Sequence, residues 1–117
     1  MTQTKFNRNQ QAIPAVQSVT SAATVTPNAD DDDEVIITAQ AAALTLANPS
    51  GSATDGQALI VRIKDNGTAR AITYGSQYRA VGVTLPSTTV VSKTLYLGFI
   101  YNATDTKWDC IGLSQEV

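Results

Sequence analysis

The sequence predicts an all-β protein, an antiparallel β-sandwich or jelly-roll-like barrel that carries an extended N-terminal arm. Hydrophobic residues make up 43% of the chain but aromatic residues only 6%, and the apolar positions are mainly Ala, Val, Ile and Leu among Thr and Ser. Such a mixture favours pleated sheet. Short strand-like segments are separated by turn residues, and no convincing helical period is present. The 117 residues fit one domain, so we expect an arm over 1–17 and a β domain over 18–117.

The first half of the β domain contains three segments of strand character. Residues 18–26 are rich in Thr and Val and stop at a Pro-Asn pair, and residues 35–38 form a short apolar strand. Residues 41–47 leave helix and strand open, because their alanine content suits a helix while their two leucines alternate as in a strand. The sequence NPSG at 48–51 then forces a turn.

Two hairpins are expected in the second half. In residues 57–64 three aliphatic side chains alternate with polar ones, and the Asp-Asn-Gly turn at 65–67 predicts a tight hairpin with 70–74 as its return strand. After a loop or edge strand, residues 93–101 and 107–113 predict a second hairpin around a short turn.

The strand over 93–101 is apolar on both faces, so both faces must be covered. A small single sheet cannot cover this much apolar surface within one chain. The pattern therefore predicts self-association, with a homotrimer as the expected state. The candidate residues for the contact between copies are Tyr96, Phe99, Ile100 and Trp108.

The N-terminal 17 residues are mostly polar and contain no acidic side chain. Scattered apolar anchors and two cations are the expected contacts of an arm that docks on a neighbouring subunit, because buried apolar side chains supply affinity and charges tune the approach. The candidate partner-binding residues are Lys5, Phe6, Arg8, Ile13 and Val16.

Several classes of function are disfavoured by composition. The net charge of -2 gives no general attraction to nucleic acid or anionic membranes. No apolar stretch approaches the roughly 20 residues of a membrane span, and the N-terminus lacks the apolar centre of a signal peptide. The basic residues around 62–79 therefore suggest a protein or intersubunit contact more than a nucleic-acid site.

No catalytic or metal site is expected. The chain has no histidine, and its single Cys110 has no candidate base, so this cysteine is expected to fill a small apolar site. Asp105 and Asp109 are close in sequence but are associated with no pocket. The run from Asp30 to Glu34 lacks the alternating spacing of a calcium loop and is interpreted as a solvated acidic turn, with a metal or basic partner as the alternative. We expect no cofactor.

From about Leu44 onward the chain resembles a module of tailed-bacteriophage virion proteins. The resemblance rests on the order of short motifs, which are Asp55-Gly56-Gln57, Lys64-Asp65-Asn66-Gly67, Leu85-Pro86, Tyr96, Tyr101-Asn102 and Lys107-Trp108-Asp109. Such modules are β-rich, typically trimeric parts of capsid decoration, head-fibre or tail-fibre proteins, and they have no active site.

The resemblance implies a structural virion protein. With an arm ahead of the module, the expected function is that of a trimeric capsid decoration, or cement, protein that attaches to the major capsid protein or another virion protein. It would be made in the host cytoplasm and would work on the capsid surface. The alternatives are a tail, neck or fibre component, or a module that binds glycans or proteins of the host surface.

Overall fold

In the computed structural model, which describes residues 13–117, the chain forms nine strands and no helix. None of the described residues therefore belongs to a helix that could cross a membrane. The strands are β1 (Val16–Val19), β2 (Thr24–Val25), β3 (Glu34–Gln40), β4 (Leu44–Leu46), β5 (Ala58–Asp65), β6 (Ile72–Tyr74), β7 (Tyr78–Ala80), β8 (Thr94–Asn102) and β9 (Lys107–Gln115). The strand-rich fold that the composition predicts is confirmed.

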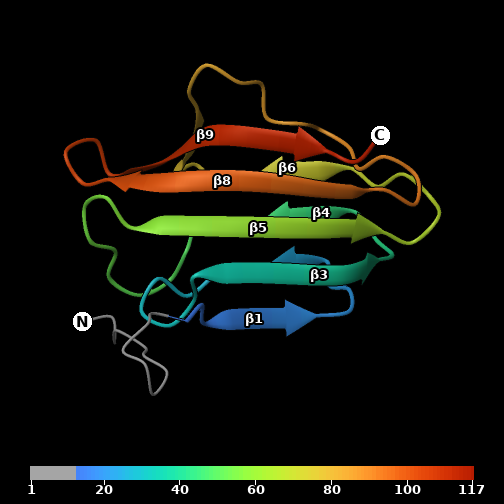
Figure 1. The fold of residues 1–117 in the computed structure, drawn as a ribbon, viewed down its shortest axis with the longest axis horizontal. Coiled ribbons are helices and arrows are strands. Elements are labelled where there is room, and N and C mark those ends of the chain that lie inside the picture. Colours follow the sequence, from blue (N-terminus) through green and yellow to red (C-terminus); the bar gives the residue numbers. More distant parts are fainter. Residues whose placement is uncertain (1–12) are drawn as a thin grey trace.

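The strands form two sheets. The larger sheet has the order β1-β3-β5-β8-β9-β7, and the smaller one, which lies behind it in Figure 1, has the order β2-β4-β6. Only the pairs β5–β8 and β8–β9 are antiparallel, and the other pairs in both sheets are parallel. The larger sheet is thus mixed, the smaller one is parallel, and neither closes on itself. The prediction of antiparallel sheets is wrong.

Parallel pairing arises because the chain winds three times around one core. Each winding places a strand in the larger sheet and then a short strand in the smaller one, first β1 and β2, then β3 and β4, then β5 and β6. Equivalent residues of successive windings lie side by side, and even the corner residues Asn28 and Ser50 form a parallel bridge. Repeated units that bury a face against their neighbours are typical of coiled repeat architectures.

The predicted hairpin at 65–67 is therefore wrong. Gly67 does have the expected positive φ, 119°, but β6 passes to the smaller sheet and pairs with β4. The second predicted hairpin is confirmed, since β8 and β9 pair along their whole length. The ambiguous segment 41–47 contains a strand, β4, because both of its leucines are buried in the core.

The two sheets share one hydrophobic core. Burial of each large aliphatic or aromatic side chain contributes about 1.5–3 kcal/mol relative to an exposed position. The buried members from the larger sheet are Val35, Ile37, Leu59, Val61, Ile63, Tyr78, Leu95, Leu97, Phe99, Trp108 and Cys110, and those from the smaller sheet are Val25, Leu44, Leu46 and Ile72.

Polar groups complete the windings at their corners. Gln40 is fully buried, and its side-chain Nε2 donates hydrogen bonds of 2.8 Å to the carbonyl oxygens of both Ala22 and Ala42. In the first winding Gln17 takes a position in line with the core residue Val35. Its amide donates to the Asp32 carboxylate and to a backbone carbonyl. In the first winding a polar side chain therefore stands where the next winding places an apolar core residue.

The start of the domain differs from the predicted boundary. β1 begins at Val16, inside the segment that the sequence assigns to the arm, and it pairs with β3. Just before β1, the backbone amide of Ala15 donates a 2.8 Å hydrogen bond to the carboxylate of Asp33. Residues 15–17 therefore belong to the β domain.

Candidate interaction surface

The larger sheet has one face turned away from the smaller sheet, and we call the outward side chains of β1, β3, β5, β8 and β9 the outer face. The register aligns one row across all five strands, namely Val16, Glu34, Ile60, Gly98 and Gly112. The next residue on the core side of each of β3, β5 and β8 is buried, because successive residues of a strand point to opposite faces.

A second row of the outer face lies two residues further along each strand. It consists of Ser18, Ile36, Arg62, Tyr96 and Ser114. The guanidinium carbon of Arg62 lies 6.0 Å from the centre of the Tyr96 ring, a distance at the limit of a cation–π contact. The positive charge of Arg62 therefore lies beside the Tyr96 ring, near the middle of the face.

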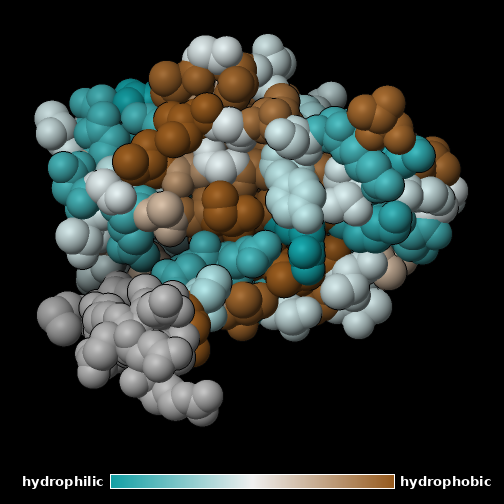
Figure 2. All heavy atoms as spheres, viewed as in Figure 1, coloured by the Kyte–Doolittle hydropathy of each residue, from teal (hydrophilic) through white to brown (hydrophobic). Residues whose placement is uncertain are grey.

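Several apolar side chains of this face are accessible to solvent. Ile13 is 45% exposed, Val16 47%, Ile60 39% and Tyr96 42%. Figure 2 shows a hydrophobic area at the centre of the face that extends to its upper edge, with hydrophilic side chains to the left, to the right and directly below the centre. Contiguous exposed apolar surface with a polar rim is the usual mark of a protein interaction site.

Two glycines lie directly opposite each other near the centre of this face, Gly98 on β8 and Gly112 on β9. Neither has a positive φ, so the adjacent irregularity in register does not require glycine there. A Cβ atom on Gly112 would meet nothing within 4 Å, and one on Gly98 would make only ordinary contacts at 3.7 Å or more. Glycine in a strand costs about 0.5–1 kcal/mol relative to Ala, and no contact within residues 13–117 explains that cost.

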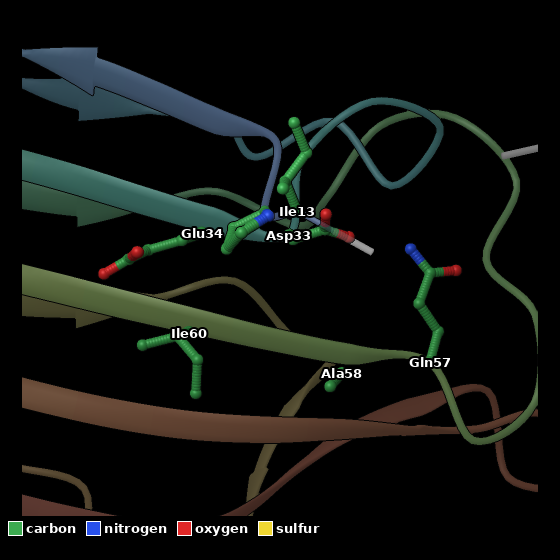
Figure 3. A pocket seen from close by; sticks show the side chains of 7 residues that line it. Ile13, Asp33, Glu34, Gln57, Ala58 and Ile60 are labelled. Atoms are coloured by element: carbon green, nitrogen blue, oxygen red, sulfur yellow. The ribbon is translucent and has the colours of Figure 1, made fainter. Parts of the chain in front are cut away.

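A shallow hollow of about 440 Å³ opens at the β1 end of the outer face. Figure 3 shows Ile13, Asp33 and Glu34 on one side of it and Ala58 and Ile60 of β5 on the other. The hollow is too open to enclose a small molecule, and its apolar floor with carboxylates at the margin suits a protruding side chain of a protein.

The outer face carries both signs of charge. Glu34 lies on β3, while Arg62 and Lys64 lie on the neighbouring β5. Lys64 Nζ is 3.9 Å from a carboxylate oxygen of Glu116, an exposed pair that contributes little to stability. Within the part of the chain that the structure describes, Glu34 and Arg62 form no ion pair.

The structure brings together some of the residues predicted to bind partners and separates others. Tyr96 lies on the outer face, and Ile100 lies there too, opposite Ala58 of β5. Phe99 and Trp108 are buried inside the chain, at 2% and 1% exposure, and pack against Tyr78 and Tyr101. Their prediction as interface residues is wrong, because the core of a single chain covers them.

The predicted contacts of the arm are also divided. Ile13 and Val16 lie on or beside the outer face at its β1 side, where β3 and β5 separate them from Tyr96 and Ile100 of β8. Lys5, Phe6 and Arg8 lie outside the described residues. The residues predicted for the arm and those predicted for the contact between copies therefore lie at different sides of the same face.

The acidic run is bound into the fold more than a solvated turn would be. Asp32 is buried and accepts a 2.7 Å hydrogen bond from the backbone amide of Asn28, and Asp30 accepts one from the amide of Ser52. Among residues 13–117 no group of three or more potential ligands is placed to hold a metal ion. The carboxylates instead anchor the corners of the windings.

The other candidate groups for chemistry are held by structural contacts. Arg79 of β7 binds Asp109 of β9 through two hydrogen bonds of 2.7 and 3.0 Å and binds Asp105 at 3.0 Å. The hydrogen bonds from Arg79 lower the pKa of Asp109 despite its burial. Burial raises the pKa of Cys110, whose thiol donates to the carbonyl of Gly112, so this thiol is held in its less nucleophilic form.

Sequence reasoning missed the glycine pair as a feature of the outer face. The signal was available, because two glycines interrupt the apolar positions of strands 93–101 and 107–113 without any turn signal beside them. Comparison with known proteins adds no assignment: no family model, no curated protein and no solved structure matches this chain.

Proposed function

We propose that the protein is a non-enzymatic structural component that binds further copies of itself and a larger protein assembly. The observation that carries this proposal is the outer face, where exposed Ile60 and Tyr96 surround a flat glycine pair on a sheet whose opposite side is already packed. Protein contacts of this kind, with an apolar centre and a polar rim, bind through aromatic anchors such as Tyr96.

Self-association would cover the exposed apolar side chains of the outer face, and a homotrimer is the state that the resemblance to virion modules implies. The two sheets with their shared core act as a rigid sandwich-like block, so copies can join without rearranging. The first test is the mass of the full chain at micromolar concentration, measured by light scattering. Three copies support the proposal, whereas a monomer contradicts self-association.

The assembly we propose is a virion, and the copies decorate the capsid surface by attaching to the major capsid protein or another virion protein. This step rests on the resemblance of residues 44 onward to virion modules, and it assigns attachment to the arm residues Lys5, Phe6 and Arg8. The alternative of host-glycan binding has less support, because the hydroxyls of Tyr74 and Tyr78 are used in hydrogen bonds to Pro86 and Ala47.

Attachment is tested with undecorated particles and a variant that lacks residues 2–12. Because residues 15–17 belong to the β domain, this deletion spares β1. We expect the truncated protein to keep the strand signature of its circular dichroism spectrum and the mass of the full chain, but to occupy fewer sites on particles. Saturation at the same concentration as the full chain would place attachment in the β domain. Occupancy of the tail alone would favour a tail, neck or fibre component.

A further inference from the structure

The outer face carries protruding and recessed features side by side. Tyr96, which is 42% exposed, is the neighbour of Gly98 two residues along β8, and Ile60 lies beside the same glycine on β5. The paired glycines add no side chain to the surface, so the backbone of β8 and β9 is open to close approach. Glycine in a strand interior often marks such an approach by another chain.

The outer face also carries two charges of opposite sign, one in each of its two rows. Glu34 belongs to the row of the glycine pair, and Arg62 belongs to the row of Tyr96. In the orientation that brings β5 of the two copies together, Tyr96 of one copy lies over the glycine pair of the other. Arg62 is then carried toward the other copy's β5, with β3 one strand spacing further, about 4.8 Å. Glu34 of that copy is the anion within reach.

We propose that the outer face is the contact between copies of this chain, with the Tyr96 ring of one copy seated on Gly98 and Gly112 of the next and Arg62 facing the next copy's Glu34. The occupant of the face is thus another copy of the same chain. The Tyr96 ring and the glycine pair lie side by side on one face, so each copy offers both halves of this knob-and-notch contact. The inference rests on the proposed self-association and specifies the residues that perform it.

The direct test fills the notch. In Gly112→Val the new side chain enters open space, so the monomer should fold, whereas the seat for the Tyr96 ring is lost. We expect sedimentation equilibrium to show association weakened about tenfold or more, the loss typical of a contact at the centre of an interface. Thr45→Val places a valine at an exposed position of the smaller sheet, away from the outer face; it removes only a side-chain hydrogen bond with Thr73 and should associate like the wild type.

A second test uses charge and does not depend on packing. Glu34→Arg and Arg62→Glu should each weaken association at low salt, and the double variant should restore it, because the two charges are exchanged between copies. Near-ultraviolet circular dichroism of the buried Trp108 verifies that each variant is folded.

The outcomes separate the inference from the proposed function. If the wild type forms trimers and neither Gly112→Val nor the charge variants alter them, the contact lies elsewhere and the inference is wrong, while the proposed function stands. If the wild type forms dimers that Gly112→Val dissociates, the contact is correct and the trimer is wrong. A wild-type monomer at all concentrations tested overturns both.

Discussion

The hydroxyl of Thr89 donates a 2.6 Å hydrogen bond to the buried carboxylate of Asp65. The same carboxylate accepts from the backbone amides of Gly67 and Ser92, and so it joins the end of β5 to two loops. In Asp65→Asn one acceptor becomes a donor that faces these N–H groups. We expect urea denaturation to show a loss of about 1–3 kcal/mol in the free energy of unfolding. Asp31→Asn, at an exposed acid of the first corner, is the control and should change stability little.

The same site predicts a dependence of stability on pH. Burial raises the pKa of Asp65, but the hydrogen bonds from Thr89, Ser92 and Gly67 outweigh it, so the pKa lies below its ordinary value of 3.8. Because the pKa is lowered in the folded state, the stabilisation is complete above pH 3.8 and is lost as the pH falls through the lower, folded value. Wild-type stability should therefore fall more steeply below pH 4 than that of Asp65→Asn. Equal slopes in acid would show that this carboxylate does not titrate in the predicted sense.

Gly67 supports a second prediction about stability. Its φ of 119° lies in a region that side chains with a branched Cβ rarely adopt. Gly67→Val should lower the free energy of unfolding by roughly 1 kcal/mol or more, although nearby space is open, because the cost is backbone strain. Thermal melting of Gly67→Val beside Gly112→Ala, a glycine without positive φ, separates strain from the mere addition of a side chain.

Gln40 provides a third prediction. Its amide binds two carbonyls from successive windings, and its oxygen accepts from the backbone amide of Ala22. Gln40→Leu keeps the volume but leaves these buried groups unpaired, at an expected cost of about 1–3 kcal/mol for each buried group that stays unsatisfied. Chemical denaturation measures the loss. A variant as stable as the wild type would mean that water replaces the amide.

Arg79 connects the edge strand β7 to β9, which yields a prediction about local opening. Lysine cannot reproduce the forked contact with Asp109. In Arg79→Lys we expect faster hydrogen exchange at residues 78–80, while β5 exchanges as in the wild type. Uniform exchange rates across both strands would contradict a local role for this pair.

Alternation along the sequence predicted many of the strands but not how they pair. β5, β8 and β9 follow from the sequence because each is a run of alternating or largely apolar side chains between turn signals. The parallel windings cannot be predicted from alternation. The partners of Val16, Glu34 and Ile60 are far apart in sequence, and no local signal encodes their alignment. The Asp-Asn-Gly turn favoured a hairpin by local chemistry, and the pairing of β6 with β4 overrode it.

Only part of the candidate site could be predicted, because the sequence does not show how the strands pair. Alternation correctly separates Tyr96 and Ile100 from Phe99, but it does not tell which of two apolar faces the chain itself covers. Trp108 was named as a candidate for the contact between copies, but it is 1% exposed and packs inside the chain against the ring of Tyr101. The glycine pair becomes meaningful only when register places Gly98 opposite Gly112.

The polar side chain of Gln17 at the first winding has a consequence for growth of larger assemblies. Coiled folds with an apolar terminal layer can stack end to end without limit, which produces fibres. Here the terminal layer is closed by an amide that is already bonded to the Asp32 carboxylate, and its two strands are short. An added layer would have to break that bond and bury a polar group. Polymerisation along the coil axis is therefore disfavoured at this end, and the proposed contact through the outer face does not require it.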